Sequence, residues 1–495
     1  MKRLLIISAL ILTAAWQSLS QNSADALRYS RIDIGGTARY IGLGGAFGAL
    51  GADFTTTSTN PAGIGLYKTS EFTITPAVHI GSVESTYNGT MLQDSHSMFY
   101  LGDVGMVLAG QSKTDPNKPG WRSFSFATGM NRLNDFNYRY DMAGFNPSNS
   151  LLDTYVEYAD GVPFTEIEED PWGDYAFDLN LAWWTYLLDL QNPLVDDQYV
   201  SPVPAGNKFQ TKSIDTHGSM NEYVFTFGAN YNDRLYLGMT FGIPFIRYYE
   251  SSVYEENQIQ NSELNYFQKI DDLETRGSGF NMKLGVIYRA SDWLRIGASF
   301  HTPSWFNNMT DYWQTTMVSE WYTPDNDGNY RYVETSPSGT YDYSLHTPYR
   351  LEGSLGFIIG NVGAIGAEYE FADYASSKLD APDYNFMEEN QAISNSYTIG
   401  HNFRIGTEWR YSIFSFRAGG KYFTSPFDND INDGSRWGVS GGVGLRQDWF
   451  FMDFAYSFSK SEEDYYFYRS DNFVPNPVLN NSRAHSILLT VGAKL

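Results

Sequence analysis

From about residue 70 to the end of the chain, apolar and polar side chains alternate in runs of about ten residues. A transmembrane β-strand needs about 9–11 residues and carries this period of two. A charge facing lipid at mid-membrane costs about 2–4 kcal/mol, so we expect the apolar face of each run to point outward. One clear run carries Phe280, Met282, Leu284, Val286 and Tyr288 on one face and Asn281, Lys283, Gly285 and Arg289 on the other.

Fourteen such runs predict fourteen strands, an even number of the kind found in single-chain bacterial barrels. Short turns such as Asn232-Asp233 and Ser291-Asp292 alternate with long connections such as 131–220 and 302–347. The fold class we predict is therefore all-β: a 14-stranded antiparallel transmembrane β-barrel with long extracellular loops that contain short helices. The predicted strands lie near 70–80, 98–110, 121–130, 221–230, 234–247, 279–290, 293–301, 348–359, 362–372, 402–410, 412–421, 436–447, 449–459 and 485–495.

Composition narrows the classes of function. The 57 acidic and 33 basic residues give a net charge of −24, which argues against a nucleic-acid partner. Aromatic residues make up 17 % of the chain, including 37 Tyr, as expected for aromatic girdles at two membrane interfaces. Cysteine is absent, which excludes disulfides and thiolate metal sites.

The N-terminus has the pattern of a secretory signal peptide over residues 1–20. Lys2 and Arg3 precede an apolar stretch that is too short to span a bilayer, and Ser18 and Ser20 suit cleavage before Gln21. An exported barrel is expected in the outer membrane of a Gram-negative bacterium. We therefore predict three parts: the signal peptide, an N-terminal segment over 21–69, and the barrel over 70–495.

The segment 21–69 is expected to plug the barrel. Barrels larger than about eight strands enclose a channel unless something fills it. This segment is rich in glycine, which suits a compact chain pressed against a wall. Within it, Asn60-Pro61-Ala62-Gly63 favours a turn without ladder partners, because proline lacks a donor and asparagine bonds to nearby backbone.

This segment resembles the N-terminal hatch of the FadL/TodX family of outer-membrane transporters. The resemblance rests on residues 40–53, Tyr-Ile-Gly-Leu-Gly-Gly-Ala-Phe-Gly-Ala-Leu-Gly-Ala-Asp, followed by Asn60-Pro61-Ala62-Gly63. It continues in Asn131–Asn137, Gly277–Tyr288 and Trp293–Pro303. The family resemblance implies passive uptake of long-chain fatty acids or aromatic hydrocarbons, which bind at extracellular loops and then above the hatch. It also implies release by hatch rearrangement or through a lateral opening, and assigns Asn60, Pro61, Ala62 and Gly63 to the hatch motif.

The long connection 131–220 carries a candidate ligand-binding helix, for which we expect Asp174 to be the N-cap. Its apolar stripe either catches a lipid-like ligand at the barrel mouth or packs against other loops. Trp184 lies off that stripe and favours an exposed apolar contact. The stripe consists of Leu179, Ala182, Trp183, Tyr186, Leu187 and Leu190 at helical spacing.

Four cations on the lumen face, Lys283, Arg289, Arg295 and Arg404, are candidates for holding a ligand carboxylate. The alternative is that they pair with acidic residues across the lumen. The seven histidines show no metal-ligand spacing, and no serine stands in a nucleophile motif. We therefore expect neither an enzyme nor a cofactor or metal.

The leading hypothesis is an uptake channel that acts as a monomer, with a hydrophobic small molecule and outer-membrane lipid as partners. The last strand, which ends at Leu495 rather than at the usual aromatic residue, is expected to be read by the barrel-assembly machinery. An alternative from the same resemblance is a cargo-binding shuttle of type IX secretion. A general polar porin is disfavoured by the plug-like N-terminal segment.

Overall fold

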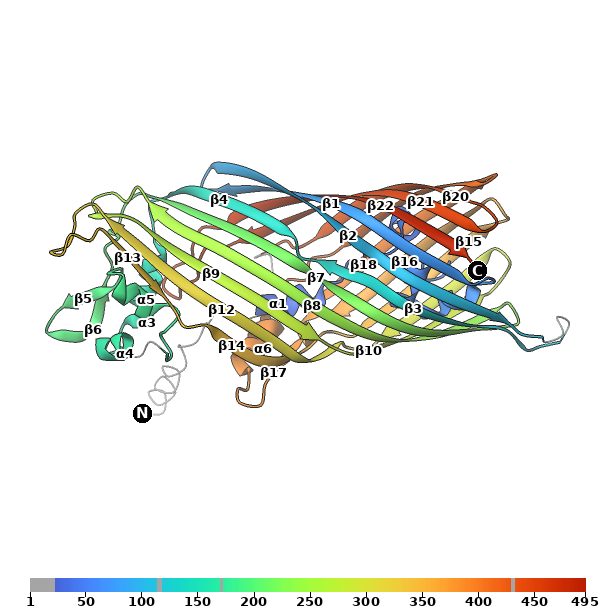
Figure 1. Cartoon of the computed structure of the whole chain (residues 1–495), viewed down its shortest axis with the longest axis horizontal. Coiled ribbons are helices and arrows are strands. Elements are labelled where there is room, and N and C mark those ends of the chain that lie inside the picture. The colour runs from blue at the N-terminus through green and yellow to red at the C-terminus, as the bar shows by residue number, and fades with distance from the viewer. Residues whose placement is uncertain (1–22, 114–117, 170–171, 429–431) are drawn as a thin grey trace, which may run out of the picture.

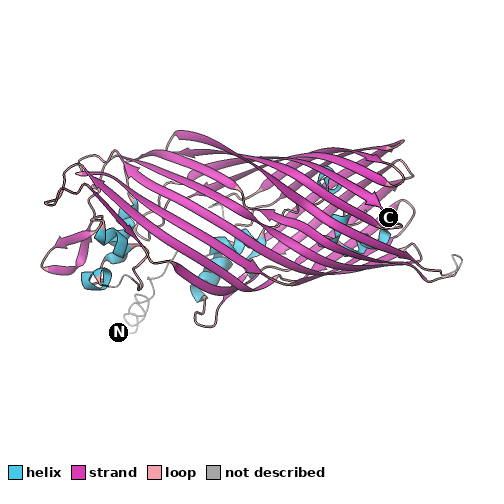
Figure 2. Ribbon diagram, in the orientation of Figure 1, coloured by secondary structure: helices cyan, strands magenta, loops and turns pink. Residues whose placement is uncertain are grey.

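The computed structural model describes residues 23–113, 118–169, 172–428 and 432–495. The expected signal peptide lies outside these ranges. The described chain forms one long barrel whose first strand pairs with its last, so the sheet closes on itself (Figures 1 and 2). Closure removes the exposed sheet edges that a membrane does not tolerate.

The elements have the following bounds. The helices are α1 Ser23–Ser30, α2 Ala38–Gly42, η1 Phe54–Ser58, η2 Pro61–Leu66, α3 Leu151–Ala159, α4 Phe164–Glu168, α5 Leu179–Trp184, η3 Tyr374–Ser376 and α6 Met387–Ser396. The strands are β1 Glu71–Tyr87, β2 Thr90–Gln111, β3 Trp121–Asp135, β4 Tyr138–Asn146, β5 Asp189–Asn192, β6 Val195–Val200, β7 Lys208–Tyr231, β8 Leu235–Asn257, β9 Leu264–Ser278, β10 Asn281–Arg289 and β11 Leu294–His301. They continue with β12 Trp305–Trp321, β13 Arg331–Thr335, β14 Gly339–His346, β15 Arg350–Ile359, β16 Gly363–Asp373, β17 Lys378–Asp380, β18 Ile399–Tyr411, β19 Phe414–Phe423, β20 Arg436–Arg446, β21 Phe450–Tyr465 and β22 Val478–Lys494.

The wall has fourteen antiparallel strands, which confirms the predicted fold. Several wall strands are interrupted once, so that two labelled elements form one strand. For example, β9 and β10 both pair with β8, and the chain between them leaves the ladder for two residues. The other interrupted strands are β3 with β4, β11 with β12, β14 with β15, and β16 with β17.

The two ends of the barrel differ. One end, here called the turn end, holds the two-residue turn Asn232-Asp233 and the C-terminus (Figure 1). Both turn residues have positive φ (57° and 55°), as a tight hairpin between twisted strands requires. The opposite end, here called the loop end, carries α3, α4, α5 and the small β5–β6 hairpin (Figure 1).

Many strands are longer than predicted, particularly toward the loop end. The predicted run 70–80 is the first part of β1, and the run 98–110 is the last part of β2. Beyond both runs the two strands extend to a two-residue turn at Asn88-Gly89. Much of the predicted loops 248–278 and 302–347 is also strand. The prediction missed these parts because strands beyond a membrane have no lipid face and need not alternate.

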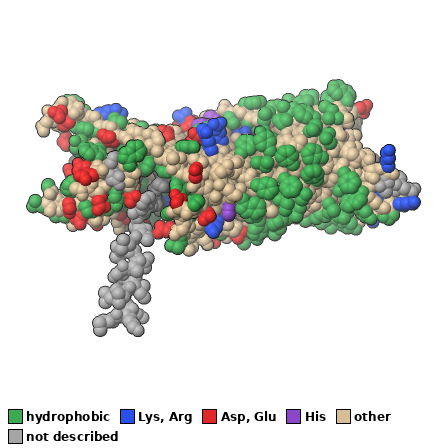
Figure 3. Space-filling view, turned by 60° about the horizontal axis from the view of Figure 1, so that its bottom comes forward, with side chains coloured by type: hydrophobic (Ala, Val, Ile, Leu, Met, Phe, Trp, Pro, Cys, Tyr) green, Lys and Arg blue, Asp and Glu red, His purple; other side chains and the backbone are tan. Residues whose placement is uncertain are grey.

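The side chains divide as the alternation predicts. Large apolar residues such as Phe403 and Val439 point outward, with about half of their surface exposed (48 % and 51 %). On the face shown in Figure 3, hydrophobic side chains form a broad band over the part of the barrel toward the turn end. Charged residues such as Glu368 and Asp453 are buried in the lumen. Within the described residues, no helix is long and apolar enough to cross a membrane.

Candidate functional site

The N-terminal segment fills the lumen and presses against the wall. Asn60 caps η2 by accepting from the Ala62 N–H (3.1 Å), and its Nδ2 donates to the Gly48 carbonyl (2.7 Å). Pro61 occupies the first position of this helix, where its missing N–H leaves no bond unmade. The predicted turn therefore exists, as the cap of a short 3₁₀ helix.

Two wall glycines allow this turn to approach. A Cβ on Gly238 of β8 would lie 2.1 Å from the Pro61 carbonyl carbon, and one on Gly285 of β10 would lie 2.1 Å from the Asn60 Oδ1. Any side chain at these two positions would therefore push the turn away from the wall. Asn60, Pro61, Ala62 and Gly63 are all buried in this contact.

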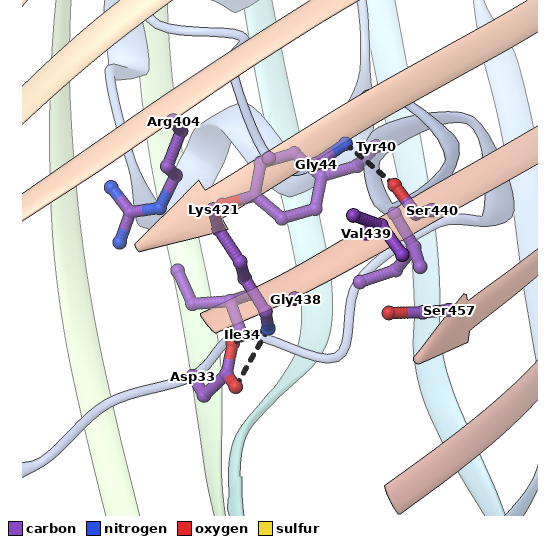
Figure 4. A pocket seen from close by; sticks show the side chains of 12 residues that line it. Asp33, Ile34, Tyr40, Gly44, Arg404, Lys421, Gly438, Val439, Ser440 and Ser457 are labelled. Atoms are coloured by element: carbon purple, nitrogen blue, oxygen red, sulfur yellow. Dashed lines mark hydrogen bonds and ion pairs between the residues drawn. The ribbon is translucent and has the colours of Figure 1, made fainter. Parts of the chain in front are cut away.

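Ion pairs fix the same segment at other points of the wall. Arg39 bonds to Glu408 (2.9 Å), which Arg417 also contacts (2.8 Å). Asp33 pairs with Lys421 (2.6 Å; Figure 4). Because these pairs are mostly buried, each is a specific attachment that must be broken when the segment moves.

The wall itself has a seam between β2 and β3. The ladder between these strands ends at Asp103↔Asn131, although β2 continues toward the loop end and β3 runs on to Asp135. Within the described residues, β4 pairs along one edge only, with β7. The part of β2 from Thr90 to Gly102 therefore has a ladder partner only in β1.

The N-terminal segment hydrogen-bonds to β3 where β2 leaves it at this seam. The Gly35 N–H donates to the Arg132 carbonyl (2.9 Å) and the Asp33 N–H to the Leu133 carbonyl (3.0 Å). Asn134 Nδ2 donates to the Arg31 carbonyl (2.8 Å). A Cβ on Gly102 of β2 would lie 2.6 Å from the Gly35 carbonyl oxygen, so the segment lies directly against both strands. We call residues 31–35 the seam segment.

Apolar clusters line the lumen from the loop end to this seam. The cluster nearest the seam contains Leu27 and Tyr29 of α1 together with Leu133 and Phe136 beside the seam. A second cluster lies at the loop end, where Leu152 of α3 and Leu179 of α5 pack with Phe267 of β9. In both clusters the buried side chains pack against one another.

A small polar cavity lies beside the seam segment. Its volume is about 20 Å³, room for about one water molecule, and it is lined by Asp33, Tyr40, Lys421 and Ser440 among others (Figure 4). A larger depression of about 910 Å³ runs along β11, β15, β16 and β18–β20. Most of its large side chains, such as Phe403 and Ile405, point outward, so it belongs to the outer wall.

The predicted loop helix is shorter than its pattern indicates. α5 spans six residues, and Asp178 rather than Asp174 is its N-cap. The difference arises because Tyr186 has positive φ (57°), which turns the chain out of the helix and leaves Leu190 in β5. Burial raises the pKa of the Asp178 carboxyl to about 6.

The stripe residues and the neighbouring Trp184 divide between the loop cluster and the surface. Leu179 and Leu187 are buried in the cluster, and Trp183 stacks on Phe164 (5.6 Å between ring centroids). Trp184 and Tyr186 remain exposed at 45 % and 56 %. The stripe thus mostly packs on other loop elements, while two aromatic side chains face outward.

The four candidate lumen cations all have partners. Lys283 Nζ lies 2.5 Å from Glu222, and Arg289 pairs with Asp292 at the turn end (2.9 Å). Arg295 donates to the Leu50 carbonyl (2.8 Å) of the N-terminal segment. Arg404 bonds to Glu368 (2.8 Å) and Glu370 (3.0 Å). A ligand carboxylate at any of them has to displace or share an existing bond.

Sequence reasoning did not single out the seam. Its signal is the run Asn131–Asp135, which is polar except at Leu133 and in which alternation stops within a strand, together with a glycine on each of the facing segments, Gly35 and Gly102. Polar runs of this kind also occur at ordinary strand ends, so the pairing partner is visible only in three dimensions.

The fold and the seam define a class of protein, a membrane-type β-barrel plugged from within. Solved structures with this fold include a FadL homologue of Pseudomonas aeruginosa (TM-score 0.53, 12 % identity) and the toluene transporters TodX of P. putida (0.53, 12 %) and TbuX of Ralstonia pickettii (0.51, 12 %). The matches cover 93 %, 94 % and 93 % of this chain and 98 %, 99 % and 98 % of the respective solved chains. The chain therefore has a FadL/TodX-like fold, as the sequence resemblance predicts. No family model and no curated protein matches the sequence.

Proposed function

We propose that this protein is an outer-membrane channel for passive uptake of hydrophobic small molecules. The observation that carries the proposal is the seam segment, which hydrogen-bonds to β3 where β2 leaves the ladder and is also held by the Asp33–Lys421 ion pair. A plug that completes the wall can open the wall by moving. In this proposal, a ligand enters between the loops, passes the apolar clusters and leaves sideways when residues 31–35 release β3.

The apolar clusters support this route. They extend from the loop end to Leu133 and Phe136 beside the seam, so a hydrophobic molecule that displaces their packing stays out of water along the lumen. The 20 Å³ cavity is too small for such a ligand, so movement of the N-terminal segment is part of the proposal. Trp184 and Tyr186 are proposed as the first contact at the loop end.

The paired cations favour uncharged ligands over carboxylates. A fatty acid carboxylate at Lys283 or Arg404 would compete with acidic partners that are already buried beside them. We therefore place aromatic and other uncharged hydrocarbons ahead of long-chain fatty acids as substrates. Two of the solved structures with this fold are toluene transporters, which supports placing uncharged hydrocarbons first. No observation on the described residues favours the secretion-shuttle alternative.

The test is uptake of radiolabelled toluene and oleate into a host strain that lacks its own channel for hydrophobic compounds. We expect faster toluene uptake when the protein is present, and a smaller effect on oleate. Trp184→Ala with Tyr186→Ala should slow uptake mainly at low substrate concentration. Unchanged uptake of both substrates by the folded protein would refute the proposal, and high ion conductance in planar bilayers would support a polar porin instead.

A further inference from the structure

Two arginines lie directly opposite each other on the outer wall. Arg247 of β8 pairs in register with Arg276 of β9, and both side chains point outward. Like charges directly opposite on neighbouring strands destabilise a sheet. A negative group between the two guanidinium groups would remove this repulsion. The chain has a net charge of −24, so its excess of acidic residues makes two facing arginines unusual. We call Arg247 and Arg276 the outer arginine pair.

The chain itself supplies only part of that negative charge. Arg276 pairs with Glu274, two residues away on the same strand, while 53 % of its side chain stays exposed. Arg247 lies over the ring of Tyr249 (5.6 Å to the centroid) and has no ion pair with a carboxylate among the described residues. Tyr249 in turn stacks on His217 of β7 (4.6 Å). The pair therefore retains an open face with net positive charge.

The height of the pair on the barrel indicates what lies beside it. Arg247 comes twelve residues after Leu235, the first residue of β8 at the turn end. Because a membrane-crossing strand takes about 9–11 residues, the arginine pair sits at the membrane border nearer the loop end. Lys and Arg side chains do gather at the edge of the hydrophobic band (Figure 3).

An apolar surface continues from the pair toward the turn end. Tyr223 and Phe245 stack on each other (5.2 Å between centroids) directly below, and Ile243 follows with 42 % of its surface exposed. An amphiphile whose headgroup meets the arginines would lay its acyl chains along these side chains.

From this arrangement we propose that the outer arginine pair binds the phosphate group of an anionic lipid in the leaflet at the loop end. Guanidinium groups bind phosphate in a bidentate manner, and basic clusters at a membrane border are recognised lipid headgroup sites. In the outer membrane, the phosphorylated lipid of that leaflet is lipid A. The proposal rests on the proposed outer-membrane location and is independent of uptake.

A second pair of cations repeats the pattern on another part of the wall. Lys460 of β21 lies directly opposite Arg483 of β22, which comes eleven residues before Lys494 at the turn end. Lys460 pairs with Glu462 (2.6 Å), whereas Arg483 is exposed. His485 and Tyr456 lie next to this pair and bond to each other (2.7 Å). Both cation pairs lie eleven or twelve residues from the turn end of their strands. Both therefore sit at the same membrane border.

The test measures lipid A binding by native mass spectrometry on the full-length barrel in detergent, with phosphorylated and with enzymatically dephosphorylated lipid A. The variant Arg247→Gln with Arg276→Gln should bind the phosphorylated lipid about tenfold more weakly, which corresponds to about 1.4 kcal/mol. The matched control is Arg234→Gln, which removes an exposed arginine at the opposite end of β8 and should bind as the parent does.

Two further measurements keep the result decisive. Lysine at both positions keeps the charge but loses the bidentate geometry, so binding should be intermediate. The heat-induced mobility shift on gels shows whether each variant is folded, and only folded barrels are compared. Equal binding by the glutamine variant and the parent would overturn the proposal, as would equal binding of both lipid forms by the parent. Uptake of toluene has no bearing on either outcome.

Discussion

A disulfide between residues 35 and 132 is expected to hold the channel closed. A Cβ placed on Gly35 would lie 3.5 Å from the Cβ of Arg132, a separation within the range that disulfides span. Gly35 is not at positive φ, so cysteine fits its backbone. The chain has no cysteine of its own, so Gly35→Cys with Arg132→Cys yields one defined pair.

The expected size of the effect follows from what holds the seam segment. Two backbone hydrogen bonds and one from Asn134 fix it to β3, and the Asp33–Lys421 ion pair fixes it to β19. At about 0.5–1.5 kcal/mol each, the three hydrogen bonds stabilise the closed state by about 1.5–4.5 kcal/mol, and the ion pair adds to this. From the hydrogen bonds alone, the released state has a population between about one in ten and one in a thousand, and the ion pair lowers it further. A disulfide removes that population altogether.

The assay compares toluene uptake by the double-cysteine variant before and after reduction. Uptake should fall to the level of cells without the channel when the disulfide is formed, and return when it is reduced. Arg132→Cys alone controls for loss of the Arg132–Asp135 ion pair (2.9 Å) and should not respond to reductant. Equal uptake by fully oxidised and fully reduced protein, with disulfide formation verified by mass, would refute release through this seam.

Three further predictions concern the plug, the lumen and the loops. Gly285→Ala should displace the turn at Asn60 and raise ion conductance in planar bilayers, whereas Gly353→Ala, whose new Cβ meets nothing within 4 Å, should leave conductance unchanged. Lys283→Met should lower the free energy of unfolding in urea by about 3–5 kcal/mol because Glu222 loses its buried partner, and adding Glu222→Leu should recover much of the loss. Because the pKa of Asp178 is raised to about 6, the folded loop binds its proton more tightly than the unfolded chain does. The protonated Asp178 therefore stabilises the folded loop fully below pH about 4, and this stabilisation is lost as pH rises through 6. Hydrogen exchange around α5, corrected for its intrinsic pH dependence, should be faster at pH 7 than at pH 5. Asp178→Asn should abolish the difference.

The part of the fold that contacts lipid was predictable because it obeys one strict rule. A strand with lipid on one side and a polar lumen on the other must alternate, as the run from Phe280 to Arg289 does. Turns such as Asn232-Asp233 then follow from residues that accept positive φ. The extensions of β7 and β8 toward the loop end could not be predicted in the same way, because no lipid face imposes a period on them.

The hatch motif and the candidate site differ in how far the sequence determines them. Asn60-Pro61 specifies a local cap, and its local geometry agrees with the structure. The partners of Lys283, Arg295 and Arg404 come from other strands or from the plug, so their pairing depends on which strands meet. The spacing of residues along one strand does not show which other strand, or which part of the plug, lies beside it.

The sequence by itself therefore determines that this chain is a fourteen-stranded barrel with a plug. Each strand shows its lipid face by the alternation of its own residues, and the N-terminal segment shows its role by its glycines and its Asn-Pro turn. Only the tertiary structure decides that β2 and β3 part at Asp103↔Asn131 and that residues 31–35 fill the seam. It alone places Arg247 opposite Arg276. The physical reason is that register and seam depend on hydrogen bonds between segments far apart in the chain, whose backbone groups are the same whatever the side chains.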